Sequence, residues 1–256
     1  MISKNKIKYI HSLESKKNRD SDGLFVAEGP KVVNDILSYF SSNIVMLVAT
    51  SQWLNRDGAK YANMPGCEVI EVSEDELTKV SLQCHPQQVL SVFRKFNNNV
   101  DPHSLKDKLT IALDGVRDPG NLGTIIRIAD WFGIENVICS KETVDVYNPK
   151  VVQATMGSIS RVNVFYMDLQ ELFVSLPTNF PIYGTLLEGD NMYSQELSKA
   201  GLIVMGNEGK GLSATTRQLV NHALRIPSFP EGSDTADSLN VAIATAIVCA
   251  EFRRRS

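Results

Sequence analysis

The stretch that decides the fold is Gly201–Glu251, with the sequence GLIVMGNEGKGLSATTRQLVNHALRIPSFPEGSDTADSLNVAIATAIVCAE. It begins with an apolar run, Leu202–Met205, which is short enough for a buried strand and leads into a glycine-rich loop. A second apolar piece stops at Pro227, and the segment after Ser238 predicts a helix of small apolar residues over 241–250. Ligands of open α/β sheets bind beyond the carboxyl ends of the strands. Two strand ends and one helix start therefore predict one concave binding site.

The glycine-rich loop at 206–211 matches neither common nucleotide-binding fingerprint. Its sequence, GNEGKG, is not G-x-G-x-x-G, and it lacks the Lys-Ser/Thr ending of a phosphate-binding P-loop. A plain surface turn between a strand and a helix accounts for the three glycines equally well. The loop chemistry alone leaves a ligand site and a structural turn both open.

The composition is that of an ordinary globular protein with one large or two modest domains. The chain has 256 residues, of which 43% are apolar and 21% are charged, and its net charge is −3. This sum neither indicates nor excludes a nucleic-acid partner, because binding depends on where the charge lies. Basic side chains are concentrated in the first 31 residues and in the terminal Arg253–Arg255. Contact with RNA and a solvated helix face are both compatible with these ends.

Cysteine spacing and hydropathy predict a cytoplasmic protein. The four cysteines are far apart, without a C-x-x-C pair or a histidine spaced for zinc, which favours free thiols in a reducing compartment and no metal. The start, MISKNKIKYIH, lacks the apolar core of a signal peptide. No apolar run approaches the roughly 18 residues that a membrane span requires.

Strand and helix patterns alternate in the first part of the chain and predict a small α/β domain over residues 1–96. Residues 3–18 predict one polar, basic helix. The remaining expected elements are strands at 23–29, 44–49, 68–72 and 88–93, and helices at 31–39, at 51–61 and after a capping box formed by Ser73 and Glu76. The polar segment at 95–108 contains three consecutive asparagines and a proline, so we place a linker at 97–107.

The strand–helix rhythm restarts over residues 108–256 and predicts a mainly parallel sheet with helices on both faces. The expected strands lie at 109–113, 136–139, 162–166, 182–186, 202–205 and 224–226. The expected helices lie at 122–132, 149–158, 168–175 and 241–250.

A second candidate site is the loop at 114–123, DGVRDPGNLG, between a buried strand and a helix. The first turn of a helix offers free N–H groups and partial positive charge, which suit a phosphate. Arg127 follows Gly123 by four residues and lies on the same helix face. A salt bridge from Arg127 to Asp130 is the structural alternative, and Arg117 in the loop is compatible with a solvated charge.

Three stretches occur in an order that is typical of one known family. They read DPGNLGTIIRIADWFG, then GLIVMGNEGKGLS, then RIPSFP followed by DSLNVAIATAI. Together they resemble the motifs of the SpoU family, the TrmH-like branch of the SPOUT RNA methyltransferases. Motif one runs here from Asn121 to Arg127, motif two from Gly206 to Gly211, and motif three from Ile226 to Asn240.

The resemblance implies a fold. Residues 108–256 are expected to form a SPOUT methyltransferase domain, with a trefoil knot around the cofactor, that assembles as a homodimer. Segment 150–158 is similar to the intervening small-residue helix of the family. The N-terminal pattern is similar to the family's L30e-like domain, a small α/β domain that binds the RNA substrate.

The resemblance also implies an activity, the transfer of a methyl group from S-adenosylmethionine to a ribose 2′-hydroxyl in structured RNA. Ribosomal RNA is the expected target, because the extra N-terminal domain suits a large folded molecule. By position in the motifs, the expected cofactor-binding residues are Thr185, Gly206, Ile226 and Leu239. The expected catalytic set is Asn121, Arg127, Glu208, Ser238 and Asn240.

The roles that the resemblance implies for these residues are consistent with elementary chemistry. A guanidinium with a pKa above about 12 rarely deprotonates, so Arg127 is expected to orient a phosphate and stabilise negative charge rather than act as a base. Glu208 would hold the arginine or the loop in place, and the amides would bind ribose or backbone. The alternatives need no substrate, with Ser238 as a helix N-cap and Asn240 as a first-turn residue.

One departure from the family pattern keeps other functions open. The loop at 228–237 is longer than usual and acidic, and Ser228 stands where a methionine is usual, so the fit to the cofactor is in question. A non-catalytic RNA-binding protein with a SPOUT-like fold is therefore an alternative, in which this loop blocks the cofactor. A tRNA 2′-O-methyltransferase is another, and transfer to a base is a third.

Overall fold

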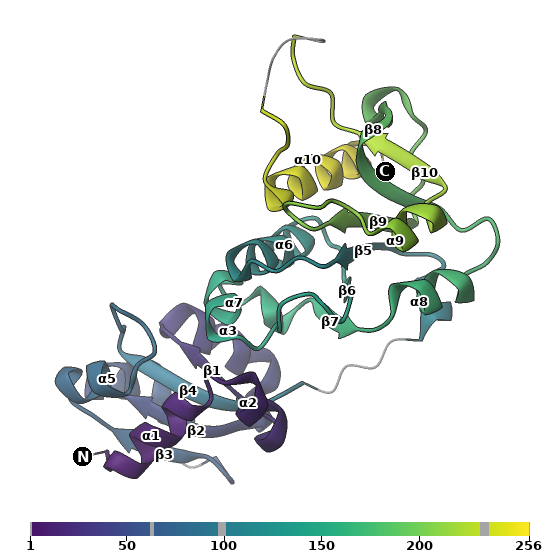
Figure 1. The fold of residues 1–256 in the computed structure, drawn as a ribbon. Coiled ribbons are helices and arrows are strands. Elements are labelled where there is room, and N and C mark those ends of the chain that lie inside the picture. The colour runs from purple at the N-terminus through teal and green to yellow at the C-terminus, as the bar shows by residue number, and fades with distance from the viewer. Residues whose placement is uncertain (1, 62–63, 97–100, 231–235, 256) are drawn as a thin grey trace. The chain divides into compact units, whose positions relative to one another are not determined.

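The computed structural model describes residues 2–61, 64–96, 101–230 and 236–255, and its fold is drawn in Figure 1. The chain divides into two compact units. The first contains residues 1–97 and 145–161, and the second contains residues 98–144 and 162–256. Segment 145–161 thus packs in the first unit, so the prediction that it belongs to the C-terminal domain is wrong.

The first unit is built on a four-stranded sheet with the order β1-β4-β2-β3. Its strands are β1 (Leu24–Glu28), β2 (Ile44–Ala49), β3 (Glu68–Glu71) and β4 (Val89–Arg94). β4 is antiparallel to both of its neighbours, whereas β2 and β3 are parallel. The helices are α1 (Lys4–Ser12), α2 (Lys16–Asp22), α3 (Pro30–Phe40), α4 (Ser51–Trp53), α5 (Glu74–Val80) and α7 (Pro149–Ala154).

Most local signals in this unit are confirmed. The capping box of α5 is formed in both directions between Ser73 and Glu76, and α3 begins at Pro30. The helix expected at 51–61 is present but irregular, because the chain is α-helical only over α4 and continues as a π turn and a 3-10 turn to Tyr61. The expected helix at 149–158 ends at Ala154, since Met156 and Gly157 both adopt positive φ.

The single basic helix expected at 3–18 is wrong, because the chain turns between α1 and α2. Arg19 is 1% exposed, and its guanidinium donates to the carbonyl oxygens of Leu13 at 2.8 Å and Glu14 at 2.6 Å. The same guanidinium pairs with Asp145 at 2.6 Å. A buried arginine therefore satisfies the carbonyls that the break in the helix leaves free.

This ion pair yields a prediction about how segment 145–161 is held. Asp145→Ala leaves the charge of Arg19 buried without its counterion, and we expect the free energy of unfolding to fall by about 3–5 kcal/mol. Lys31→Ala is the control, because Lys31 pairs with Asp35 at the surface and its loss should cost less than about 1 kcal/mol. Urea denaturation followed by circular dichroism measures both. Equal midpoints for Asp145→Ala and the unmodified protein would show that the pair does not hold the segment.

The second unit is a six-stranded sheet in which every neighbouring pair is parallel, with the order β10-β8-β9-β5-β6-β7. The strands are β5 (Leu109–Asp114), β6 (Asn136–Cys139), β7 (Asn163–Tyr166), β8 (Ile182–Asn191), β9 (Gly201–Gly206) and β10 (His222–Arg225). The helices are α6 (Pro119–Trp131), α8 (Leu169–Ser175), α9 (Ala214–Leu219) and α10 (Val241–Arg254). The predicted parallel sheet with helices on both faces is confirmed. The trefoil knot stays a prediction.

Helices cover this sheet on two sides. In Figure 1, α6 and α10 lie together on one side, and α8 and α9 lie on the other. A core beneath α8 joins Ala112, Ile138 and Val204 from three strands of the sheet to Leu172 and Phe173 of that helix. Helix α9 has no counterpart among the expected elements, although Ser213 caps it by accepting a hydrogen bond from the N–H of Thr216.

The strand order creates a topological switch point between β5 and β9. From β5 the chain continues to β6 and β7 on one side, and then crosses to β8 and β9 on the other. Loops beyond the carboxyl ends of two such strands diverge and leave a crevice. The crevice here lies between the loop after Asp114 and the GNEGKG loop that starts at Gly206. Asp114 and Gly206 are paired in register at the ends of β5 and β9.

The three arginines at the end of α10 all make contacts within the protein. Arg254 and Arg255 both pair with Glu251, which is buried, and Arg253 donates to the carbonyl oxygens of Phe132 at 2.7 Å and Gly133 at 3.0 Å. The two hydrogen bonds of Arg253 hold the end of α10 against the end of α6. Among the described residues, no helix is long and apolar enough to cross a membrane.

Candidate active site

The GNEGKG loop is a closed turn organised by Asn207. The backbone of Asn207 exchanges two hydrogen bonds of 2.9 Å with that of Gly211, and its side-chain oxygen accepts from the N–H groups of Gly209 and Lys210. Its side-chain nitrogen donates to the carbonyl oxygen of Gly115 at 2.7 Å. One asparagine thus shapes the loop after β9 and ties it to the loop after β5. Asn207 is not among the residues predicted for the site, although an asparagine at the start of a glycine-rich turn is a signal that the sequence contains.

Two of the three glycines are required by the backbone. A Cβ on Gly206 would lie 2.3 Å from the carbonyl carbon of Gly211, so the turn closes only if residue 206 has no side chain. Gly211 has a φ of +67°, in the left-handed region that favours glycine. The plain-turn reading of these residues is therefore correct for the backbone, and it leaves the side chain of Glu208 to be explained.

The carboxylate of Glu208 is the acceptor on which this site converges. It accepts from the side-chain nitrogen of Asn121 at 3.0 Å and from that of Asn207 at 3.3 Å. The backbone N–H groups of Arg117 and Asp118 approach it at 3.5 and 3.4 Å. Glu208 therefore holds the loop before α6, one of the two roles expected of it, and does not contact Arg127.

These hydrogen bonds set the protonation of Glu208. Partial burial by itself raises the pKa of the carboxyl, but the hydrogen bonds from Asn121 and from backbone N–H groups outweigh it and lower the pKa. The carboxylate is thus ionised near neutral pH and is a weak base. Because folding lowers the pKa of Glu208, this carboxylate contributes to the free energy of unfolding at pH values above its pKa in the unfolded chain. The contribution is lost as the pH falls through its pKa in the folded protein.

Asn121 connects Glu208 to the start of the last helix. Its side-chain oxygen accepts a hydrogen bond of 2.8 Å from the side-chain nitrogen of Asn240. The oxygen of Asn240 in turn accepts from the N–H groups of Ala242 and Ile243, so Asn240 is the N-cap of α10. The alternative that made Ser238 the N-cap is wrong, because Asn240 occupies that position. The chain Asn240–Asn121–Glu208 joins the three sequence motifs in one row of hydrogen bonds.

Arg127 lies outside this row. It is six residues beyond Asn121 on α6, which places it about 9 Å along the axis and about 120° around it. Its side chain is exposed, and in the part of the chain that the structure describes it makes no hydrogen bond or ion pair. The alternative salt bridge from Arg127 to Asp130 is thus not formed. The guanidinium is available to a ligand.

The four expected cofactor residues lie within β8, at the end of β9, directly after β10 and just before α10. Thr185 comes directly after the last residue of β8 that pairs with β9, and its hydroxyl donates to the carbonyl oxygen of Val204 at 3.2 Å. Gly206 ends β9, Ile226 follows β10, and Leu239 precedes α10 with half of its surface exposed. Two apolar side chains, a hydroxyl and strand-end main chain suit the purine and ribose of S-adenosylmethionine, so the residues present fit this group.

Two predictions from the sequence gain no support from the contacts of the described residues. Ser238 is exposed, and no hydrogen bond of its side chain is found within the described residues. The loop at 228–237, whose length put the cofactor fit in question, includes residues 231–235, which lie outside the described residues. In the ranges that are described, no group of three or more His, Cys, Asp or Glu side chains is placed to hold a metal.

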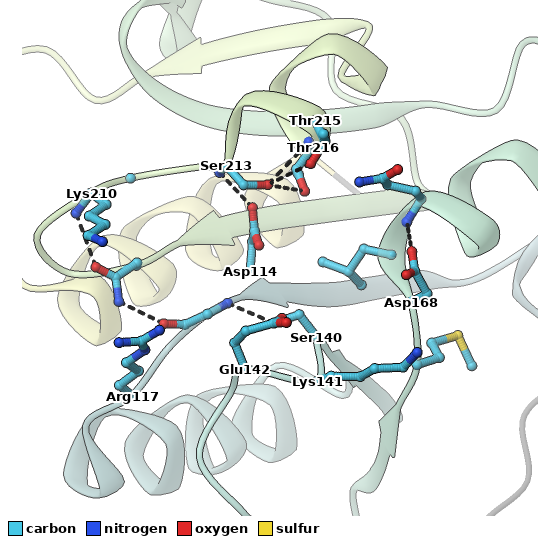
Figure 2. Close-up of a pocket in the computed structure, with 16 residues that line it drawn as sticks. Asp114, Arg117, Ser140, Lys141, Glu142, Asp168, Lys210, Ser213, Thr215 and Thr216 are labelled. Atoms are coloured by element: carbon cyan, nitrogen blue, oxygen red, sulfur yellow. Dashed lines mark hydrogen bonds between the residues drawn. The ribbon is translucent and has the colours of Figure 1, made fainter.

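The crevice at the switch point holds a cavity of about 340 Å3, shown in Figure 2. The cavity lies beyond the carboxyl ends of β5, β6, β7 and β9. None of the nine expected site residues lines it. It shares the two loops of the hydrogen-bonded row, since Gly115, Arg117, Asn207 and Lys210 are among its lining residues. The row and the cavity are therefore two sides of the same pair of loops.

Comparisons with known proteins extend over both units. The family described as the SpoU rRNA Methylase family matches residues 108–250, and the MRM3-like substrate binding domain matches residues 4–91. The chain is 31% identical over 258 residues to 23S rRNA (guanosine(2553)-2′-O)-methyltransferase RlmP of Bacillus subtilis, across 97% of this chain and 96% of that protein. It is 29% identical to the 23S rRNA (guanosine-2′-O-)-methyltransferase RlmB of Neisseria meningitidis, across 71% and 74%.

Solved structures agree with these matches. The AdoMet-bound rRNA methyltransferase of Sinorhizobium meliloti is similar with a TM-score of 0.85 and 32% identity, across 100% of this chain and 96% of that one. The family match over 108–250 includes every candidate site residue.

Proposed function

The chain belongs to the SpoU rRNA methylase family, and from this premise we propose that it methylates a ribose 2′-hydroxyl of ribosomal RNA with S-adenosylmethionine as the donor. The observation that carries the proposal is the row Asn240–Asn121–Glu208, which brings one polar residue from each of the three motifs together. The relatives support the substrate, because RlmP and RlmB are named as 2′-O-methyltransferases of 23S rRNA. The Sinorhizobium meliloti protein was crystallised with the donor bound.

The chemistry left to the protein is positioning and charge. The donor supplies an electrophilic methyl group, so the chain must align a ribose oxygen and assist the departure of its proton. We assign the positioning to the row of amides, because both polar atoms of the Asn121 side chain are fixed by a partner. Glu208 serves this row as an acceptor rather than as the base, since its pKa is lowered.

Arg127 is the residue that we expect to contact the RNA near the reacting oxygen. Its guanidinium is exposed and uncommitted, so it can hold a phosphate and stabilise the negative charge that develops as the oxygen loses its proton. A cationic group also lowers the free energy of an alkoxide without having to accept a proton itself.

We further propose that the second unit forms a homodimer through the exposed face of α6 and α10. Trp131 is 85% exposed at the end of α6, and Ile243 is 54% exposed in the first turn of the adjacent α10. Large apolar side chains exposed on neighbouring helices mark an interaction surface. Trp131 follows Arg127 by four residues, so both lie on the same face of α6.

The proposed dimer can be tested by introducing a charged side chain at the centre of its interface. Trp131→Glu is expected to give a monomer in sedimentation velocity at micromolar concentration, because it places a carboxylate in an apolar contact. Val174→Glu is the control, since Val174 is 74% exposed on α8, on the other side of the sheet. A dimer that persists in Trp131→Glu and dissociates in Val174→Glu would place the interface elsewhere.

Binding of the methyl donor distinguishes the proposed enzyme from the non-catalytic RNA-binding alternative. Titration calorimetry of the purified protein with S-adenosylmethionine should show saturable binding if the proposed function is correct. Absence of binding would favour an RNA-binding protein whose loop at 228–237 closes the site. Methylation of tRNA and not of rRNA by the same preparation would favour the tRNA alternative.

We place the activity in the cytoplasm, in keeping with four cysteines that are all free.

A further inference from the structure

The cavity at the switch point is lined by loops from four strands of the second unit. It lies between the loop after β5 and the GNEGKG loop after β9, and it continues past Lys141 and Glu142 toward the start of α8 (Figure 2). Its volume of about 340 Å3 is near the lower end of the range for ligand sites, about 300–1,000 Å3. A single nucleotide is a ligand of suitable size.

Two of the acidic side chains in the cavity are already engaged by main-chain donors. Asp114 accepts from the N–H of Ser213 at 2.7 Å, and Figure 2 shows the two residues facing each other. Asp168 accepts from the N–H groups of Gln170 and Glu171 at 2.9 and 3.3 Å, as the N-cap of α8. Their negative charges therefore stabilise the walls of the cavity and do not need a cation from a ligand.

The basic side chains of the cavity, by contrast, have no hydrogen-bond partners among the described residues. Arg117, Lys141 and Lys210 are exposed, and none has a side-chain hydrogen bond or ion pair within the ranges that the structure describes. Glu142 is the remaining exposed carboxylate in the lining. The lining has equal numbers of cationic and anionic side chains, but two of its three carboxylates are held by main-chain donors, whereas all three cations are free to bind a phosphodiester.

We infer that this cavity binds a nucleotide of the substrate RNA that neighbours the methylated one, with Arg117 and Lys210 contacting phosphate on one side of the cavity and Lys141 contacting phosphate on the other. The inference rests on the proposed function. Its structural basis is that the two loops are shared, because Arg117 directs its backbone N–H to Glu208 while its side chain lines the cavity. A nucleotide held there fixes the position of the next ribose relative to the row of amides.

Lys141→Ala is the cleanest test, because Lys141 follows β6 and contacts no residue of the row. Binding of an unmodified 23S rRNA transcript is measured over a range of salt concentrations. We expect Kd to rise about threefold to tenfold and the slope of log Kd against log salt to fall by about 0.7–0.9, the loss of one phosphate contact. The affinity for S-adenosylmethionine, measured by calorimetry, should stay unchanged, and Lys141→Arg should bind as the unmodified protein does.

The matched control is Lys199→Ala. Lys199 is an exposed lysine just before the start of β9, whereas Lys210 follows the end of β9. The two lysines therefore lie at opposite ends of this strand. Its loss should leave both the affinity and the slope unchanged. The inference is overturned if Lys141→Ala binds RNA as the unmodified protein does, or no more weakly than Lys199→Ala. If the unmodified protein neither binds nor methylates the transcript, the proposed function itself fails, and the two failures are thereby distinguished.

Discussion

Arg127→Ala is expected to lower the rate of methyl transfer by at least about 1,000-fold while the affinity for S-adenosylmethionine stays within about twofold of the unmodified value. The reason is the placement of the side chain. Arg127 is exposed on α6 without a partner in the described part of the chain, so its removal breaks no contact of the fold or of the row Asn240–Asn121–Glu208. Single-turnover kinetics with an rRNA substrate measures the rate, and calorimetry measures the affinity.

Two further variants make this result specific. Lys199→Ala removes an exposed cation from the same unit and should leave the rate unchanged. Arg127→Lys should recover only part of the activity, because an ammonium cannot hold a phosphate with two parallel hydrogen bonds. A rate in Arg127→Ala within about tenfold of the unmodified rate would remove Arg127 from the catalytic set.

The second large effect is expected from Asn121→Asp. This change replaces the amide nitrogen that donates to Glu208 at 3.0 Å with a carboxylate oxygen, so two carboxylates face each other. The repulsion raises the pKa of the pair, and at neutral pH we expect the rate of methyl transfer to fall at least about 100-fold. Because protonation of one carboxyl restores a donor, the relative loss should become smaller as the pH is lowered.

The double variant Asn121→Asp with Glu208→Gln tests the contact itself. The new amide at position 208 would donate to the new carboxylate at position 121, which still accepts from Asn240, so the row is rebuilt with its donor and acceptor exchanged. A coupling of about 0.5–3 kcal/mol corresponds to a recovery of about twofold to 150-fold relative to Asn121→Asp. Rates that multiply independently would show that the hydrogen bond between these side chains has no part in catalysis.

The sequence predicts which residues form the row Asn240–Asn121–Glu208 better than it predicts which side chains they contact. The three motifs identify Asn121, Glu208 and Asn240, and the parallel sheet brings their loops together. The partner of Glu208 depends on the angle around α6, and residues six apart face different directions. Glu208 therefore meets Asn121 and the backbone of the preceding loop, and Arg127 remains free. No spacing rule within one motif determines this pairing, because it is set by the register between β5 and β9.

The cavity is less visible in the sequence, because its basic residues belong to three separate loops. Lys141 follows β6, and it lines the same cavity as Arg117 and Lys210 only because β6 is adjacent to β5 and β5 to β9. The break between α1 and α2 has a similar origin. It depends on Arg19 reaching Asp145, which is 126 residues away, so the local pattern of a basic helix gives no sign of it.

The most direct test of the central claim is the chemical identity of the product. The purified protein is incubated with S-adenosylmethionine carrying an isotopically labelled methyl group and with an unmodified 23S rRNA transcript. The RNA is then digested to nucleosides and analysed by mass spectrometry. The account predicts label in a single 2′-O-methylated nucleoside, and none with Arg127→Ala. Label on a base, or no label from a protein that binds both RNA and donor, would contradict it.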